Sequence, residues 1–130
     1  KKLAEESAAI YKQYAGEKFR QNKYEQLLTT PLQCSHVIAI GCKRHKNDLP
    51  EMEEIASVAC ALQNIYLTVA AYGIGGYWST GGITVIPEAK PLFDLGPDDI
   101  LMGFFYLGYI RVPAAPGVRK SIRDKVKWVG

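Results

Sequence analysis

The feature that most constrains the fold is a long run without charged side chains, from Ile55 to Pro87. Small or uncharged residues alternate in its first half with apolar ones. The apolar residues recur at three- and four-residue steps, the period of one helical face: Ile55, Val58, Ala59, Leu62, Ile65, Tyr66 and Val69. A helix without a charged face is normally buried on all sides. The sequence therefore predicts a long, fully buried helix.

Both ends of this helix are marked in the sequence. We expect it to begin at Asp48 or Pro50, because glutamates follow where a helix N-terminus favours negative charge. We expect it to end at Gly73, since glycine accepts the left-handed conformation that ends many helices. The segment Gly73–Gly76 superficially resembles a phosphate loop, but such loops follow a strand and open a helix. We interpret it as a helix end and a tight turn.

The other expected elements suit a sheet packed against this helix. Two apolar runs predict buried strands, and the second, apolar on both faces, is central. Residues 17–30 are mixed, polar and weakly helical. The remaining expectations are a helix over 1–14 that ends near Gly16, strands over 35–42 and 100–110, a short strand near 76–81 and a short surface helix from Pro87. The fold class is α+β or α/β, in a single domain over 1–130.

Composition excludes several classes of protein. The net charge of +3 is too small to argue for nucleic acid. The polar pair Gln63–Asn64 lies in the middle of the uncharged run, so we expect no membrane span. The three cysteines show no metal-ligand spacing and are interpreted as reduced thiols, which leads us to expect a cytoplasmic protein without a metal site.

The first candidate site is Trp78-Ser79-Thr80-Gly81. Glycine lets a flat ligand approach the main chain closely, and neighbouring N–H groups can donate to it. Aromatic and hydroxyl side chains beside a glycine are typical of a pocket with few polar groups. The competing interpretation is that Trp78 anchors the core while Ser79 and Thr80 stand at a strand end.

The second candidate site is the basic tail. Five cationic residues follow a Pro/Gly linker and close on Trp128: Arg119, Lys120, Arg123, Lys125 and Lys127. They are either a solvated face, or Arg119 folds back to clamp a phosphate, which its guanidinium geometry suits. No Ser/His/Asp set, paired carboxylates or Cys/His nucleophile stands out, so any enzyme chemistry is expected to come from a bound cofactor.

Taken together, four pieces of the chain resemble the FMN-dependent nitroreductase family: ALQNIYLTVAAYGIGGYWSTGG, Pro87 with Leu95-Gly96, ILMGFFYLGYI and VRKSIRDKVKW. Their order and spacing agree with the family from about Ser35 to Trp128. The family's Gln-Asn helix, its glycine-rich turn before Trp-x-Thr-Gly and its Gly-Phe-x-Tyr-Leu-Gly-Tyr strand all have counterparts here.

The resemblance implies an α+β flavoprotein with the nitroreductase fold. It implies an intertwined homodimer, with the long helix in its core and FMN at the subunit interface. NAD(P)H would reduce the flavin, and a nitroaromatic, quinone or related small acceptor would reoxidise it in a ping-pong cycle. By the family pattern, Trp78 to Gly81 lie along the isoalloxazine, with an N–H near Thr80 or Gly81 donating toward flavin N5. Arg119 matches the tail residue that reaches the FMN phosphate.

One family motif has no counterpart. Members begin with a helix carrying an Arg-x-Ser-x-Arg-like motif that grips the FMN phosphate, and nothing in Lys1 to Thr30 matches it. We therefore expect that an N-terminal segment is missing from the domain. Two alternatives stay open: a non-catalytic flavin-binding or dimerising module, and a flavoenzyme of another reaction, such as reductive dehalogenation or flavin fragmentation.

Overall fold

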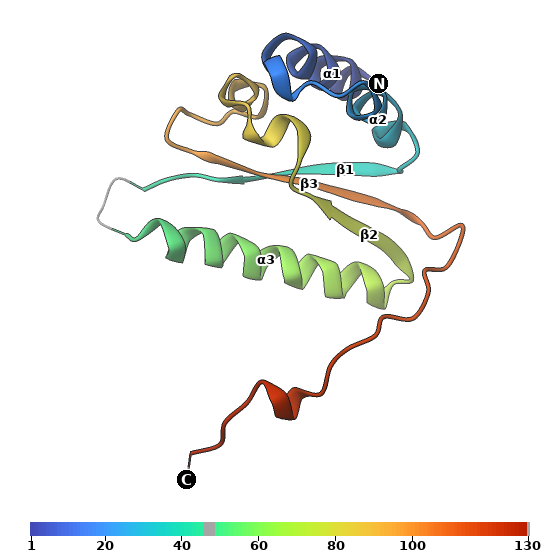
Figure 1. The fold of residues 1–130 in the computed structure, drawn as a ribbon, viewed down its shortest axis with the longest axis vertical. Helices are drawn as coiled ribbons and strands as arrows, with labels where there is room; N and C mark the ends of the chain where they lie inside the picture. The colour runs from blue at the N-terminus through green and yellow to red at the C-terminus, as the bar shows by residue number, and fades with distance from the viewer. Residues whose placement is uncertain (46–48, 130) are drawn as a thin grey trace.

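The computed structural model describes residues 1–45 and 49–129. A three-stranded antiparallel sheet lies between two helical layers (Figure 1). The helices are α1 (Lys2–Tyr14), α2 (Gln21–Thr29) and α3 (Glu51–Ala71), and the strands are β1 (His36–Cys42), β2 (Ile74–Ser79) and β3 (Ile100–Tyr109). Two 3-10 helices, η3 (Gly82–Val85) and η4 (Pro87–Phe93), join β2 to the turn before β3. The α+β prediction is confirmed, and the weakly helical segment contains a nine-residue helix, α2.

The strand predicted to be central, β3, is central. It pairs antiparallel with β1 on one side and β2 on the other. The register against β1 shifts between Ile40 and Gly41. Opposite that shift Gly103 has φ +140°, a conformation that side chains rarely adopt. Glycine at this position lets β3 accommodate the bulge.

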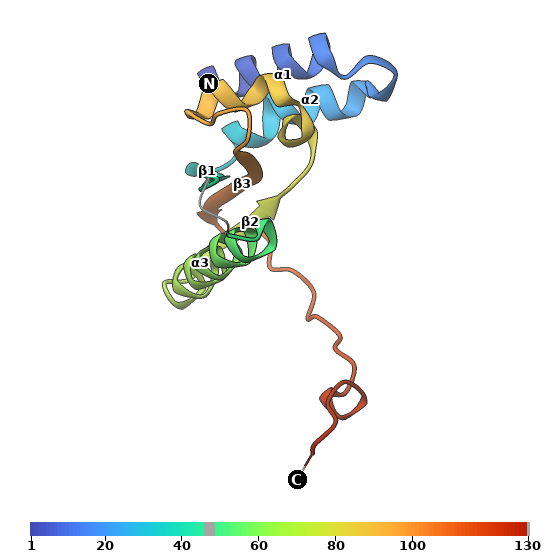
Figure 2. The ribbon, with the colours of Figure 1, turned by 90° about the vertical axis from the view of Figure 1, so that its left-hand side faces the viewer.

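Side chains alternate across β3 and supply two cores. Phe105 is fully buried and packs with Ile40 and Leu62 beneath α3. Phe104 points to the opposite face, where α1, α2, η3 and η4 form the second layer (Figure 2). The larger core on that side contains Ala8, Tyr11, Leu27, Ile83, Ile86, Ala89, Leu95, Leu101 and Phe104.

The prediction that α3 is buried on all sides is wrong for the single chain. The predicted apolar face is the correct one, since Val58, Ile65, Tyr66 and Val69 pack against the core beneath the helix. The opposite face is open to solvent: along α3, which the structure describes throughout, Leu62 and Glu54 alone are buried. The spacing of apolar residues identifies the face of a helix that packs on the core. The absence of charged residues on the opposite face does not show whether the same chain covers that face.

By length and composition alone, α3 could cross a membrane, but the core helices of soluble proteins meet the same criteria. Its ends follow the prediction. Pro50 precedes the first residue, three glutamates occupy the first turn, and Gly73 with φ +69° follows the last turn. Asp48, the other predicted start, lies outside the described residues.

Two further parts of the chain differ from expectation. The strand β1 was predicted to be buried, yet it is an edge strand with most of its residues exposed. A branched apolar run does not by itself distinguish a central strand from an edge strand. Beyond β3, residues 111–129 are exposed and run away from the sheet in both views (Figures 1 and 2).

Candidate functional site

The four predicted residues at the end of β2 do not all face one way. Trp78 points toward α3 and packs with the core that contains Phe105. Its indole Nε1 donates a 3.2 Å hydrogen bond to the carbonyl oxygen of Met102, next to the bulge in β3. Within one chain, Trp78 therefore serves as a core anchor, which is the competing interpretation of this residue.

Ser79 lies on the other side of the sheet, facing α2. With Tyr77 and Tyr106 it lines a hollow of about 100 Å³, which is closed from above by α2 residues. The two tyrosine rings stack at 6.4 Å between centroids. Beyond Ser79 the chain turns away from the sheet, and the carbonyl oxygen of Thr80 accepts a hydrogen bond from the Thr84 hydroxyl at 2.5 Å. This turn joins β2 to η3.

Gly81 occupies the exposed tip of this turn. Its φ of −105° is open to any residue, so the backbone does not demand glycine. A Cβ built there would meet a single described atom within 4 Å, Nζ of Lys23 at 3.8 Å. The N–H of Gly81 donates to no acceptor among the described residues. The fold thus leaves bare main chain facing open space, which suits a flat external group.

Lys23 is a residue that the sequence analysis missed. It comes from the first turn of α2 and lies across the turn that follows β2, with Cε 3.1 Å from the Cβ position of Gly82 and Nζ 3.8 Å from that of Gly81. Gly82 has φ +77°, a conformation that glycine adopts readily and that the turn requires. Because Gly82 has no side chain, the lysine stem can lie against it. Nothing in the sequence pattern joins residue 23 to residue 81; the sheet and α2 bring them together.

Arg119 stands apart from this group. It belongs to residues 111–129, the exposed segment that runs away from the sheet (Figure 1). Among the described atoms, Lys23 Nζ alone lies within 4 Å of the Cβ position of Gly81. The structure thus places Ser79, Thr80 and Gly81 beside Lys23, turns Trp78 toward α3, and leaves Arg119 distant.

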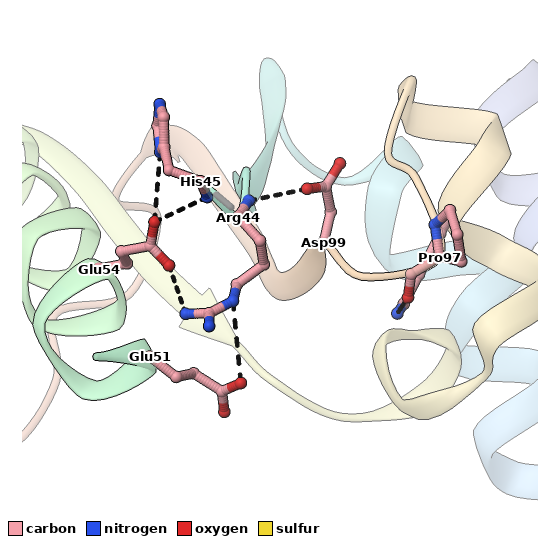
Figure 3. A network of polar contacts seen from close by, with 7 residues as sticks. Arg44, His45, Glu51, Glu54, Pro97 and Asp99 are labelled. Carbon is pink, nitrogen blue, oxygen red and sulfur yellow. Dashed lines mark hydrogen bonds and ion pairs between the residues drawn. The ribbon is translucent and has the colours of Figure 1, made fainter. Parts of the chain in front are cut away.

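A second polar cluster joins the end of β1 to the start of α3 (Figure 3). The buried carboxylate of Glu54 accepts from the Arg44 guanidinium and, at 2.8 Å, from the backbone N–H of His45. The imidazole Nδ1 of His45 lies 3.2 Å from the same carboxylate. The backbone N–H of Arg44 donates to Asp99 at 2.8 Å. This hydrogen bond connects the cluster to the turn before β3.

These contacts shift the carboxylates toward their charged forms. The pKa of Glu54 is lowered chiefly by the His45 backbone hydrogen bond, with Arg44 adding to the effect. The pKa of Asp99 is lowered chiefly by the backbone N–H groups of Arg44 and Gly96. Both carboxylate oxygens of Glu54 and both of Asp99 accept a hydrogen bond, so the evident role of these two residues is structural.

A hollow of about 330 Å³ lies beside this network and includes Cys42 and Ser57 in its lining. Burial raises the pKa of the Cys42 thiol, so it stays protonated and is a poor nucleophile. Among the described residues, no three His, Cys, Asp or Glu side chains gather as metal ligands. The turn at Gly81 is therefore the better candidate site.

Comparison with known proteins points to one family. The chain is 28% identical over 100 residues to the candidate NAD(P)H nitroreductase YdjA of Escherichia coli (strain K12), and equally to its counterpart in Escherichia coli O157:H7. The match covers 76% of this chain and 54% of YdjA, so the chain spans about half the length of the curated relatives it matches. No protein-family model matches the chain.

Solved structures agree on the fold. The nitroreductase-like family protein from Bacillus cereus superimposes with a TM-score of 0.75 over 98% of this chain and 67% of its own length, at 16% identity. The nitroreductase family protein from Streptococcus pneumoniae TIGR4 gives 0.51 over 95% of this chain and 57% of its own length, at 12% identity. The fold predicted from the resemblance is confirmed.

Proposed function

We propose, from this resemblance to the nitroreductases in sequence and fold, that the protein is an FMN-dependent oxidoreductase that uses NAD(P)H. The observation that carries the proposal is Gly81, whose bare main chain and open Cβ side stand at the end of β2. In a fold of this class such a position suits the edge of an isoalloxazine ring. When bound, FMN would accept electrons from NAD(P)H and deliver them to a nitroaromatic, quinone or related acceptor in a ping-pong cycle.

The residues of the turn would hold the ring rather than react with it. The N–H of Gly81, which lacks an acceptor among the described residues, would donate to a ring nitrogen or oxygen. The hydrogen bond between Thr80 and Thr84 fixes the backbone just before it. Main-chain recognition of this kind needs no acid or base side chain, which agrees with the missing nucleophile and triad.

The residues present fit the ring better than the phosphate of FMN. The described part of α1 and α2 has no Arg-x-Ser-x-Arg-like motif, and Arg119 lies on the exposed tail. We propose that Arg119 reaches the phosphate only when the tail is ordered against a second subunit. This would explain why the basic tail is exposed and runs away from the sheet within one chain.

We further propose a homodimer in which a second copy covers the open face of α3. That face is uncharged beyond its first turn and carries Leu67 at 61% exposure and Met52 at 73%. A 21-residue helix with an uncharged exposed side is unusual for a monomer, and a second copy offers a face of equal character. A cytoplasmic location would agree with three free cysteines.

The visible spectrum of the purified protein tests the proposal. We expect flavin absorbance that NAD(P)H bleaches and that a quinone or nitroaromatic restores. A colourless protein that also rejects added FMN would refute flavin dependence. Flavin binding without turnover of any acceptor would instead favour the second candidate, a non-catalytic flavin-binding or dimerisation module. This candidate is also supported by the lack of a nucleophile or catalytic triad around the turn among the described residues.

A further inference from the structure

We infer that Lys23 is a positioning residue for the redox group at Gly81, and that its ammonium favours the reduced form of that group over the oxidised form. The inference rests on the proposed function, because it concerns the charge that a flavin meets at this turn. The sequence pattern does not point to residue 23.

Geometry supplies the first support. The space where a side chain of residue 81 would lie is bordered by Lys23 Nζ at 3.8 Å, so a ring packed against Gly81 meets the ammonium as well. The lysine stem lies along Gly82, with Cε 3.1 Å from its Cβ position. Gly82 is bare and left-handed there, so the turn itself makes room for the lysine.

Charge supplies the second support. Lys23 forms no ion pair with the described carboxylates, although Lys1, Lys2 and Arg44 all do. The hollow that Lys23 helps to line has no carboxylate among its other residues, which are aliphatic, aromatic, hydroxyl or amide side chains: Gln26, Leu27, Thr30, Tyr77, Ser79 and Tyr106. Lys23 is half-buried, and its ammonium has no described carboxylate within ion-pair distance, so it is available to an electron-rich ligand.

The expected effect follows from electrostatics. A two-electron reduced flavin carries more negative charge than the oxidised ring, so a fixed cation nearby stabilises the reduced form more. Removing the cation should weaken binding of reduced FMN more than binding of oxidised FMN. The same difference appears as a lower midpoint potential of the bound flavin.

The experiment uses FMN itself with the variants Lys23→Met, Lys23→Arg and Lys2→Met. Methionine keeps the length and helix propensity of lysine but removes the charge. Lys2→Met is the matched control, since Lys2 pairs with Glu6 at the start of α1 and its loss changes the net charge equally. The dissociation constants of oxidised and reduced FMN and the midpoint potential are measured for each protein.

For Lys23→Met we expect affinity for reduced FMN to fall about tenfold more than affinity for oxidised FMN, equal to ~30 mV in potential for a two-electron couple. Lys23→Arg and Lys2→Met should stay close to the parent protein. Equal losses for both redox forms, or an unchanged potential, would overturn the role of Lys23 while leaving the proposed function intact. A parent protein that binds no FMN would overturn both.

Discussion

The hydroxyl of Tyr66 on α3 donates a 2.7 Å hydrogen bond to the carbonyl oxygen of Gly76 on β2. The Tyr66 ring also meets Phe105 edge-on, at 4.8 Å between centroids. Gly76 must be bare at this point, because a Cβ would lie 2.6 Å from the Phe105 ring. These contacts connect α3 to the strand that ends at the candidate site.

Tyr66→Phe should keep the ring contact and lose the hydrogen bond. We expect the free energy of unfolding to fall by about 1–2 kcal/mol, the usual loss for a half-buried hydrogen bond whose acceptor is left unpaired. Urea unfolding measures the change. Tyr72→Phe is the control, since Tyr72 is 79% exposed, and it should leave the midpoint unchanged. Equal effects of the two variants would show that the bond to Gly76 contributes nothing.

Gly103→Ala should destabilise the fold more strongly. A Cβ at Gly103 would lie 2.4 Å from the carbonyl oxygen of Ser79 and 2.6 Å from the Trp78 indole nitrogen, and φ is +140°. Both distances are too short for a real Cβ, one of the two atoms is paired backbone, and the φ angle is strained for alanine. We therefore expect a loss of at least about 2 kcal/mol in unfolding free energy. Thermal or urea unfolding checks this against Gly117→Ala, where a Cβ meets nothing within 4 Å.

Gly81→Val separates binding from folding. The backbone conformation at residue 81 is open to any residue, and a Cβ there meets only the far end of Lys23, so we expect no change in the midpoint of unfolding. FMN binding should weaken by more than tenfold, because the side chain fills the space where the ring would pack. Fluorescence titration with FMN measures the affinity. Normal affinity in a folded variant would place the flavin elsewhere.

Arg119→Ala tests the tail. The residue is exposed, so we expect no change in unfolding. If Arg119 reaches the FMN phosphate in the dimer, its loss should cost about 1.5–3 kcal/mol of FMN binding, the usual range for a hydrogen bond to a charged group. Lys120→Ala is the neighbouring control in the same titration. Losses of equal size from both variants would indicate a general effect of positive charge.

The ionisation of Glu54 should contribute to the pH dependence of the free energy of unfolding. Its pKa in the folded protein lies below the ordinary value of 4.5, so the unfolded chain takes up protons first as the solution is acidified. The stabilisation is therefore complete above about pH 4.5 and is lost as pH falls through the lower, folded-state pKa. In urea unfolding from pH 7 to pH 3, Glu54→Gln should flatten part of the acid decline. Glu53→Gln, at an exposed neighbour, should leave the decline unchanged.

The sequence predicts the elements of this fold well because their signals are local. The three-to-four-residue period of α3, Gly73 at its end and the apolar run of β3 each depend on neighbours in the chain, and all three are confirmed. The resemblance to nitroreductases, which rests on several such pieces in order, is confirmed as well.

The sequence predicts poorly what depends on partners distant in the chain. It does not show that β1 is an edge strand, because a strand's neighbours are set by topology. The different directions of Trp78 and Ser79 follow from strand alternation, yet the position of Lys23 over Gly81 follows from the packing of α2 on the sheet. These features depend on contacts between residues distant in the chain, which the local spacing of residue types does not encode.

The order of strands also bears on how the protein is made. Since β1 and β2 pair only with β3, neither has a sheet partner until residues 100–109 have left the ribosome. During that interval the apolar face of α3 lacks Phe105, the fully buried residue of the core on which it later rests. The nascent chain thus passes through a stage, dozens of codons long, in which aggregation competes with folding and a chaperone has most to bind.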